Sequence, residues 1–403
     1  MSNKLHHSTP RCGFRRLRIA VVGGSLTGPT VALLLLQAGF ERVSIFEAVP
    51  GGCAQTGGLI GVEHSTLDVL DRLGIGQDEF VHHRSEHIMH TRIRPGHAET
   101  IRRVYPGRNT TWTLLHAALA ARVPATILRS GLRVTGLHAH HGTHDGSPVL
   151  AFVDGATEPA DLVVFADGRA STGRALLDPD RHIRYAGYVA HRGTAPATPA
   201  LTDFERFEPC PGVQFNIAPI PDGADWTFYL NATPRQYAGM FGAPPHRRPF
   251  VLPRYVSRAA REHVDRAATD LAGAGLTGTY AAAVHDTGRR MAVAVADIDP
   301  PRQMVWTVGD GYAVLLGDAL APVRPHTARG LNNGIEQAAG LVAALTQVGK
   351  YGADLGAALA GWQRRHLPAA VAAVRLGPVI GGRLGLGLSR QDDRVPTAAG
   401  SLR

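Results

Sequence analysis

The chain has 403 residues, of which 44% are hydrophobic, 19% charged and 6% aromatic. This composition predicts a globular protein with one large domain or two joined domains, and it excludes collagen-like and wholly disordered chains. The formal net charge is +9, and all but two of the 42 basic residues are arginines. Because these arginines are scattered along the chain, the charge indicates solubility or an anionic ligand, and we expect no nucleic-acid partner.

The cysteines and histidines give no sign of a disulfide framework or a metal site. The three cysteines form no CxxC pair, which favours a reducing, cytoplasmic setting. His138, His140, His141 and His144 fall on an expected exposed turn, and we expect no bound metal. No apolar stretch reaches 18 residues, so we expect no stable membrane association. A monomer or a homodimer is expected.

The first patterned region predicts a βαβ unit. Residues 1–15 are polar and basic, and we expect a disordered tail there. A short apolar strand over 18–22 is followed by a glycine-rich turn over 23–28 and a helix over 29–38. A second strand over 43–47 completes the unit.

The rest of the chain alternates between helical and strand patterns. Helices are expected over 65–73 and 112–122, a hairpin from 132–137 and 149–153, and a buried strand over 162–165. From 183 to 295 the pattern alternates and is rich in aromatic residues, which predicts a second sheet with one face against a ligand or helices. A strand over 312–316, a helix over 333–345 and two further alanine-rich helices are expected to close the chain.

The glycine-rich turn predicts a dinucleotide site. Gly23 and Gly28 occupy the first and third glycine positions of a G-x-G-x-x-G fingerprint, and Ser25 takes the middle one. The fingerprint lets the backbone approach a pyrophosphate at a helix N-terminus, and we expect Leu26 and Thr27 to line it as well. Glu47 ends the second strand, where its carboxylate can accept hydrogen bonds from both ribose hydroxyls. This favours FAD or NAD over NADP as the bound dinucleotide.

Two later segments resemble motifs of a known enzyme family. Residues 161–174 resemble the D-G motif of flavoprotein aromatic hydroxylases, and residues 315–341 resemble their G-D motif. Together with the fingerprint, the motifs cover the chain from about 17 to 345 in the order of the family. The chain therefore resembles a group A, single-component FAD monooxygenase of the para-hydroxybenzoate hydroxylase type. The segments 110–119, 185–193 and 323–330 are similar to 2,6-dihydroxypyridine 3-hydroxylase and its relatives. The matching motif residues are Asp161, Asp167, Gly168, Ser171, Arg174, Gly317, Asp318, Pro325, Gly330, Asn332 and Gly334.

The resemblance implies a fold and a set of cofactor-binding residues. The fold is α/β, with a Rossmann-like FAD-binding domain, a second, mainly antiparallel β-sheet domain for the substrate, and C-terminal helices. Glu47 would hold the adenosine ribose and Asp318 the ribityl chain, and the backbone from Gly330 through Leu331 to Asn332 would lie beside the flavin ring. Asp167 and Pro325 belong to the same set. Gln55 lies where the family often has an arginine, and it could donate a hydrogen bond to the cofactor.

The resemblance also implies the reaction. Such an enzyme uses NAD(P)H and O2 to hydroxylate a small aromatic, heteroaromatic or polycyclic substrate through a flavin C4a-hydroperoxide. His326 is the first candidate for an acid/base or substrate-orienting residue. The other catalytic candidates are His191, Tyr188, Arg192 and Tyr229. His191 stands where the subgroup tends to have a tryptophan.

The expected domains follow the motifs, and two other functions stay open. We expect an FAD-binding domain over 16–182, with part of the substrate sheet around 85–105, and a substrate domain over 183–299. The FAD-binding domain resumes over 300–345, and helices and a tail follow over 346–403. The alternatives are a Baeyer–Villiger oxidation or epoxidation of a secondary metabolite by the same flavin chemistry, and a non-catalytic flavin-binding regulator.

Overall fold

The computed structural model of the protein describes residues 16–51, 53, 57–82, 87–94, 97–139, 146–196, 201–221 and 223–387. The chain forms two compact units. The first unit comprises residues 1–81, 106–182 and 298–375, and the second comprises 82–105, 183–297 and 376–403. The expected tail over 1–15 and the histidines at 140, 141 and 144 lie outside the described residues.

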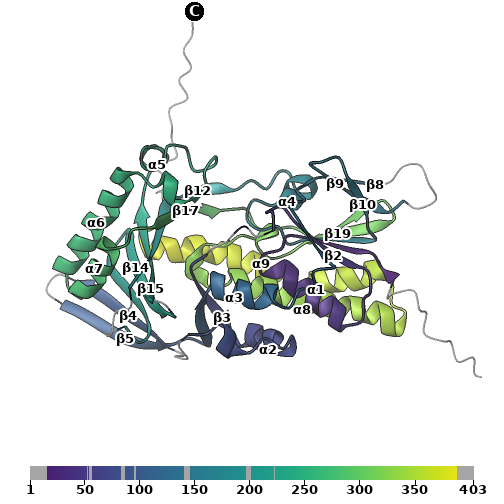
Figure 1. Ribbon diagram of the computed structural model, residues 1–403, viewed down its shortest axis with the longest axis horizontal. Coiled ribbons are helices and arrows are strands. Elements are labelled where there is room, and N and C mark those ends of the chain that lie inside the picture. Colours follow the sequence, from purple (N-terminus) through teal and green to yellow (C-terminus); the bar gives the residue numbers. More distant parts are fainter. Residues whose placement is uncertain are drawn as a thin grey trace, which may run out of the picture. The chain divides into compact units, whose positions relative to one another are not determined.

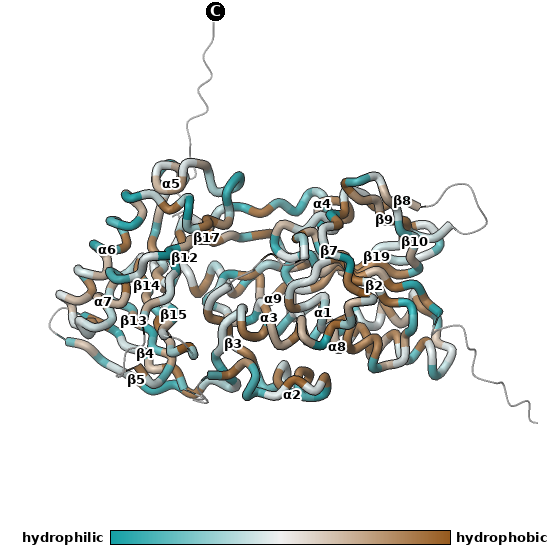
Figure 2. The backbone as a smooth tube through the Cα atoms, viewed as in Figure 1, coloured by the Kyte–Doolittle hydropathy of each residue, from teal (hydrophilic) through white to brown (hydrophobic). Residues whose placement is uncertain are grey.

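A six-stranded sheet forms the centre of the first unit, in the order β18-β19-β11-β1-β2-β7 (Figure 1). Its strands are parallel except for β18. β1 and β11 are buried at every position, which explains their unbroken apolar sequences, and Figure 2 shows the hydrophobic character around β2 and β19. The bounds are β1 Ile19–Val22, β2 Val43–Glu47, β7 Leu128–Ser130, β11 Leu162–Phe165, β18 Val305–Val308 and β19 Gly311–Leu315.

Helices and two small sheets complete the first unit. Helix α1 begins two residues earlier than expected, which keeps Pro29 in the first turn, where its missing N–H has no helical acceptor to lose. The expected hairpin is confirmed as β8 and β9, with β10 beside β9, and β3 pairs with β6. The strand bounds are β3 Leu59–Glu63, β6 Gly107–Thr111, β8 Val134–Ala139, β9 Pro148–Phe152 and β10 Thr157–Pro159. The helix bounds are α1 Thr27–Gln37, α2 His64–Arg72, α3 Trp112–Ala120, α4 Thr172–Leu177 and α8 Gly330–Tyr351, with short 3-10 turns η2 Gln77–Glu79, η4 Gly317–Ala319 and η5 Pro325–Thr327.

The expectation of two helices after α8 was wrong for the described part of the chain. One helix, α9, runs from Leu355 to Arg383 and contains Pro368 and Pro378. A proline removes one helical hydrogen bond and strains the preceding turn. The other bonds of this long helix and the burial of Trp362 keep it continuous across both prolines. Asp354 starts the helix, since its carboxylate accepts from the N–H of Ala357 at 2.8 Å.

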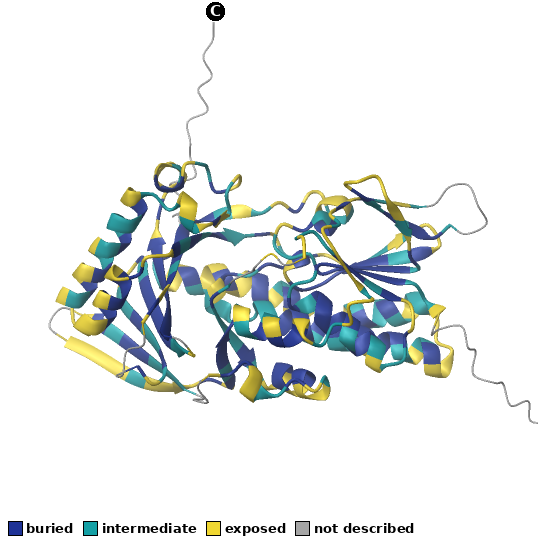
Figure 3. Ribbon diagram, in the orientation of Figure 1, coloured by how far each residue is buried: buried dark blue, intermediate teal, exposed yellow. Residues whose placement is uncertain are grey.

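The second unit is built on an eight-stranded sheet in the order β16-β17-β12-β15-β14-β13-β4-β5. All neighbours are antiparallel except β13 and β4. The strand β5 closes one edge and is exposed along nearly its whole length (Figure 3). The bounds are β4 His87–Arg94, β5 His97–Val104, β12 Arg184–Ala195, β13 Phe204–Cys210, β14 Val213–Ile220, β15 Gly223–Asn231, β16 Phe250–Val251 and β17 Arg290–Asp297.

One face of this sheet packs against helices. Apolar side chains on that face, among them Phe215, Trp226 and Phe228, share a core with α6 and α7. A second cluster joins Val189 to α5 and α6. The helix bounds are α5 Pro234–Phe241, α6 Arg258–Gly273 and α7 Gly278–His285, with the 3-10 turn η3 Pro253–Tyr255.

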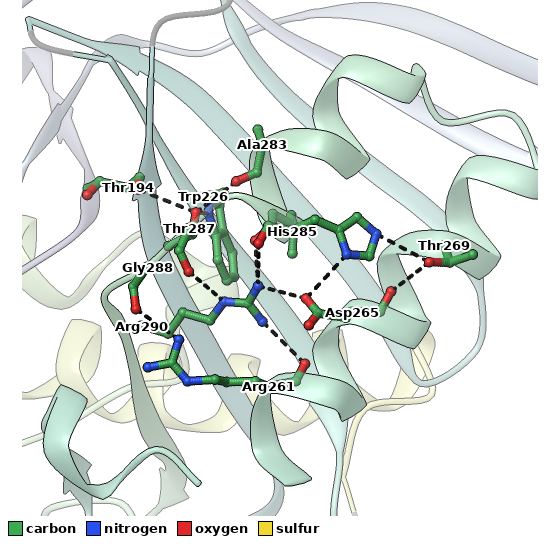
Figure 4. A network of polar contacts seen from close by, with 11 residues as sticks. Thr194, Trp226, Arg261, Asp265, Thr269, Ala283, His285, Thr287, Gly288 and Arg290 are labelled. Carbon is green, nitrogen blue, oxygen red and sulfur yellow. Dashed lines mark hydrogen bonds and ion pairs between the residues drawn. The ribbon is translucent and has the colours of Figure 1, made fainter. Parts of the chain in front are cut away.

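A buried arginine joins these helices to the sheet (Figure 4). Arg290, on β17, is 3% exposed and donates to the carboxylate of Asp265 on α6 at 2.7 Å. It also donates to backbone carbonyls of α6, α7 and the loop after α7. Thr287, in that loop, accepts the indole N–H of Trp226 at 2.8 Å. These bonds fix how α6 and α7 sit on the sheet. Among the described helices, none is long and apolar enough to cross a membrane.

Candidate functional site

The three sequence motifs meet at one edge of the first unit's sheet. Val22 is paired with both Phe46 and Phe165, and Phe165 is paired with Leu315. Because these strands are parallel, the residues after them emerge at the same edge. Gly23, Glu47, Asp167 and Asp318 therefore begin four neighbouring loops, although they are separated by up to about 300 residues in sequence.

The glycine turn leaves no room for a side chain at Gly23 or at Gly28. Gly23 has φ +110°, and a Cβ there would lie 2.4 Å from the carbonyl oxygen of Ala166. A Cβ on Gly28 would lie 1.8 Å from the carbonyl oxygen of Gly23. Leu26 points into the apolar core, and Thr27 is the first residue of α1. A bound group at this turn would therefore meet backbone and the Ser25 hydroxyl, because the Leu26 side chain is turned away.

Glu47 is held in one orientation by the backbone around it. Its Oε2 accepts from the N–H of Gly24 at 2.6 Å, and its Oε1 accepts from the N–H of Val49 at 2.7 Å. Each carboxylate oxygen keeps a further lone pair. This fixed acceptor at the end of β2 matches the expected ribose-binding role, which stays a prediction.

Helix α3 supports the glycine turn from the side. The indole N–H of Trp112 donates to Ser25 Oγ at 3.2 Å, and the ring stacks on His116 with 4.4 Å between centroids. Burial lowers the pKa of His116, while the Gly24 backbone and the Glu47 charge raise it. Sequence reasoning named neither Trp112 nor His116. The contact between Trp112 and Ser25 spans 87 residues. Both Trp112 and His116 lie in the segment 110–119 that resembles the hydroxylase family, and they stand four positions apart on one helix, but neither feature indicated this contact.

Asp167 organises its own loop. Its Oδ1 accepts from the Ser171 hydroxyl at 2.5 Å, and its Oδ2 accepts from the N–H groups of Thr172 at 2.7 Å and Gly173 at 3.2 Å. Burial raises the pKa of Asp167, and these hydrogen bonds oppose the rise. The side chain caps the start of α4, so the geometry favours a structural contribution to the expected cofactor site.

Arg174 ties the second motif to the third. Its guanidinium donates to the carbonyl oxygens of Ala319 at 2.8 Å and Asp318 at 3.3 Å. Burial lowers its pKa to about 10. The Asp318 carboxylate is exposed and accepts no hydrogen bond from the described residues. The surrounding protein nevertheless desolvates it enough to raise its pKa, against the charges of Arg169 and Arg174. Asp318 thus presents a free acceptor where the resemblance expects the ribityl chain.

The turn around Asp318 is anchored to helix α8. Gly317 has φ +57°, and its N–H donates to Oε1 of Gln337 at 2.8 Å. Gln337 is almost fully buried, and its own carbonyl oxygen accepts the indole N–H of Trp362 at 2.9 Å. Gly334 allows α8 to approach α1, since a Cβ there would lie 2.6 Å from Thr27 Oγ1. The helix, the glycine turn and the third motif are thus packed as one piece.

Helix α8 begins at Gly330 beside a fixed network. Asn332 is completely buried, and its Oδ1 accepts from Thr66 Oγ1 at 2.7 Å and from the N–H of Glu63 at 2.9 Å. Leu331 packs against the apolar core. Arg329 forms ion pairs with Glu63 and Glu336. These side chains already have partners within the protein. A ligand at the start of α8 would therefore meet the backbone N–H groups of its first turn.

The remaining predicted residues of the first unit lie before this helix. Pro325 and His326 form the short turn η5, in which Pro325 is exposed and His326 half-buried. Ala328 follows with φ +53°, the one described non-glycine residue with positive φ. Gln55 lies outside the described residues. The roles expected for Pro325 and His326 stay predictions.

In the second unit, the structure separates the four predicted catalytic residues into two groups. Side chains alternate along a strand, so Tyr188 and Arg192 lie on one face of β12 and His191 on the other. Tyr229 pairs with Ala190 and shares the face of Tyr188. His191 lies toward the helices, with ring centroids 5.9 Å from Phe241 and 6.1 Å from His263. The structure does not bring His191 together with the other three.

The face that carries Arg192 is polar, and most of its polar side chains are buried. Cross-strand pairing places Arg192 next to Thr227, Thr227 next to Asn216, and Asn216 next to Arg206. We call this row, together with Tyr229, the polar face. Arg206 Nε donates to Asn216 Oδ1 at 3.3 Å. Burial raises the pKa of Tyr229, whereas the charges of Arg192 and Arg206 lower it. Sequence reasoning missed Arg206 and Asn216, because only the strand register brings them to Tyr229.

Comparisons with known proteins decide the family. A family model described as "FAD binding domain" matches residues 16–375 of the chain. The chain belongs to this FAD-binding family. The FAD-binding chain is 28% identical to 6-hydroxynicotinate 3-monooxygenase of Pseudomonas fluorescens over 363 residues, 85% of this chain and 86% of that protein. It is 29% identical to 3-amino-4-hydroxybenzoate 2-monooxygenase of Streptomyces cremeus, over 82% of this chain and 79% of that one.

Solved structures share the fold of this FAD-binding protein. The 2,6-dihydroxypyridine 3-hydroxylase of Arthrobacter nicotinovorans has a TM-score of 0.77 at 22% identity, over 94% of this chain and 95% of that one. Klebsiella pneumoniae HpxO, solved with FAD and uric acid, has a TM-score of 0.69 at 20% identity, over 91% and 89% of the two chains. The expected fold and the expected family are confirmed.

The protein is an FAD-dependent monooxygenase of the aromatic hydroxylase type, with NAD(P)H as co-substrate. The residues at the sheet edge fit the FAD. Gly23 and Gly28 let the backbone of the turn pack more closely than any side chain would allow, Glu47 and Asp318 offer carboxylate oxygens, and no described side chain caps the N–H groups at the start of α8. Within the part of the chain that the structure describes, no group of three or more His, Cys, Asp or Glu residues could hold a metal ion.

Proposed function

We propose that this monooxygenase hydroxylates a small aromatic or heteroaromatic ring that carries an ionised oxygen substituent, a phenolate, a pyridinolate or a carboxylate. Two relatives are named for 6-hydroxynicotinate and 3-amino-4-hydroxybenzoate, and both compounds are hydroxylated ring acids. A third relative is named for 2,6-dihydroxypyridine, whose hydroxyl groups can ionise. An electron-rich ring is also the kind of ring that an electrophilic hydroxylation would require.

The observation that carries this proposal is the guanidinium of Arg192. Its Nε is buried and has no hydrogen-bond partner among the described residues. A buried donor without a partner is costly, so a site that keeps one is suited to a ligand that satisfies it. Arginine matches planar, two-oxygen groups such as a carboxylate. Arg192 is therefore the residue proposed to hold the ionised oxygen of the substrate.

The neighbours of Arg192 support an orienting role for the polar face. Tyr229 stands close enough for Arg192 and Arg206 to lower its pKa against the effect of burial. Its phenol can exchange a proton or a hydrogen bond with a ring hydroxyl. Asp225 lies on the same face and adds one negative charge to the two arginines. An ionised substrate oxygen would balance the positive charge of Arg192.

When bound, FAD would supply the redox chemistry that links NAD(P)H and O2 to the substrate. The chain supplies binding, orientation and proton transfer. Glu47 and Asp318 would hold the cofactor, and the first turn of α8 would stabilise negative charge on it. Arg192 and Tyr229 would orient and activate the substrate ring. His326 stays the first candidate for a proton-transferring residue in the first unit, and a cytoplasmic monomer or homodimer stays our expectation.

Substrate-stimulated oxidation of NAD(P)H tests this proposal. Purified protein should be yellow and should oxidise NAD(P)H faster with hydroxylated pyridines or ring acids than with their neutral analogues. Mass analysis should find one added oxygen atom in the product. Stimulation by neutral rings alone, or insertion of the oxygen beside a carbonyl, would contradict the proposed substrate class.

Arg192→Gln separates binding from catalysis. Loss of a charge-assisted hydrogen bond of about 1.5–3 kcal/mol should raise KM for an acidic substrate roughly tenfold to a hundredfold, with a smaller change for a neutral analogue. Arg184→Gln, at the exposed end of the same strand, is the matched control and should leave KM unchanged. Equal effects of the two variants would remove Arg192 from the proposed site.

A further inference from the structure

The glycine turn contains a hydroxyl whose direction is set by a residue outside the fingerprint. Ser25 takes the place of the middle glycine, and Trp112 Nε1 lies 3.2 Å from its Oγ. An indole nitrogen can only donate, because its lone pair belongs to the aromatic ring. Ser25 Oγ must therefore accept this bond. The serine proton is then left free to be donated elsewhere.

We propose that Trp112 is a positioning residue that directs the Ser25 hydroxyl as a donor toward a phosphate oxygen of the bound FAD. This inference rests on FAD as the cofactor and is independent of the substrate proposed above. Ser25 lies between the end of β1 and the start of α1, where a pyrophosphate binds in this type of βαβ unit. The first turn of α1 contains no acidic residue.

The Ser25 hydroxyl is important because the turn has no charged side chain to bind a phosphate. Residues 23–28 read GGSLTG and contain no cation. The Thr27 hydroxyl contacts the third motif, since its Oγ1 would lie 3.2 Å from a Cβ on Gly317 and 2.6 Å from one on Gly334. Ser25 is thus the side chain of this turn that is placed to add a neutral donor to the backbone N–H groups. A fixed donor binds a phosphate better than a rotating one, because less rotational freedom is lost on binding.

Trp112 itself is held firmly enough to act in this way. Its backbone N–H donates to the carbonyl oxygen of Gly58 at 2.9 Å, and the side chain of the preceding Thr111 caps α3. Its ring stacks on His116 one turn later. A Cβ on Gly57 would lie 2.6 Å from Trp112 Cβ, so the chain passes close over the tryptophan. The indole therefore cannot turn away from Ser25 without disturbing these contacts.

A double-mutant cycle on FAD affinity tests the inference. The dissociation constant of FAD is measured by flavin fluorescence for the wild type, Ser25→Ala, Trp112→Phe and the double variant. Ser25→Ala should weaken binding about tenfold, as expected for a lost hydrogen bond to a charged group. Trp112→Phe keeps the ring that stacks on His116 and should weaken binding about threefold. In the Ser25→Ala background, Trp112→Phe should have no further effect.

The controls separate positioning from general damage to the fold. Trp226→Phe removes an indole-to-hydroxyl bond of the same kind, to Thr287 in the second unit, and should leave the FAD dissociation constant within twofold of the wild type. Circular dichroism and thermal unfolding show whether each variant is folded. If the effects of Ser25→Ala and Trp112→Phe multiply in the double variant, Trp112 acts by packing alone and the inference is overturned. A wild-type protein that binds no FAD would overturn both this inference and the proposed function, whereas failure of every ring substrate would affect only the latter.

Discussion

Gly28 shows how a single residue controls the cofactor site. A Cβ at this position would lie 1.8 Å from the carbonyl oxygen of Gly23, which is a backbone atom and cannot move aside. We predict that Gly28→Ala lowers the free energy of unfolding by about 3 kcal/mol, the upper range for overpacking, and abolishes FAD binding. Chemical denaturation and flavin fluorescence measure the two effects.

Gly239 provides the matched control for that substitution. It lies in helix α5 with nothing within 4 Å of an added Cβ. Gly239→Ala should raise the free energy of unfolding by about 0.5–1 kcal/mol, because alanine is the better helix former. Equal destabilisation by both substitutions would mean that the turn is looser than the structure shows.

His191 makes the free energy of unfolding depend on pH. Burial, together with the charges of His263 and Arg290, lowers its pKa from 6.5 to about 3. The unfolded chain takes up a proton near pH 6.5 and the folded chain does not, so the contribution of neutral His191 is complete above pH 6.5 and is lost as the pH falls toward 3. The loss is about 1.4 kcal/mol for each pH unit in this window.

We therefore predict that His191→Phe makes folding less sensitive to acid. The free energy of unfolding of the wild type should fall by about 2 kcal/mol between pH 7.5 and 5 on account of this residue, and the variant should lack that part of the decrease. His263 keeps a lowered pKa of its own in the variant, so some sensitivity remains. Denaturation curves at both pH values are the measurement, and parallel pH profiles for the two proteins would refute the prediction.

The packing of α6 and α7 on the sheet depends on the ion pair between Arg290 and Asp265. Arg290 is 3% exposed, so removing its carboxylate partner leaves a buried charge that is stabilised only by neutral groups, namely backbone carbonyls and the Trp226 ring. We predict that Asp265→Ala lowers the free energy of unfolding by about 2 kcal/mol, measured by urea denaturation. The same helix offers a control, because Glu262 pairs with Arg258 at the surface. Glu262→Ala should change the stability by less than about 0.5 kcal/mol.

The first unit as a whole should be stabilised by its cofactor. Ligand that binds only the folded state raises stability by about 4 kcal/mol at a thousand times its dissociation constant. We predict that removal of FAD lowers the thermal unfolding midpoint, and that adding it back restores the midpoint. The Asp318→Ala variant should bind FAD more weakly, so the same FAD concentration should raise its unfolding midpoint by less. A midpoint independent of FAD would contradict the placement of the cofactor in this unit.

At the level of the whole chain, the sequence was sufficient for the cofactor motifs. Gly23, Glu47 and Asp318 each end or follow a short apolar strand, so their local patterns predicted the turns that the structure shows. The sequence also indicates which of the catalytic candidates share a face of β12. Tyr188 and Arg192 are an even number of positions apart and lie on one face, whereas His191 is an odd number of positions from both and lies on the other. A helix that continues through Pro368 and Pro378 was not predictable, since its burial outweighs the local cost of each proline.

The sequence by itself determined the family, the cofactor and the strands and turns that carry the three motifs, because such motifs are short and carry their chemistry locally. Only the tertiary structure decided that Trp112 reaches Ser25, and that Arg206 and Asn216 stand in a row with Arg192. These contacts depend on strand register and on the packing of α3. Both are set by interactions between residues far apart in the chain, for which no local pattern exists.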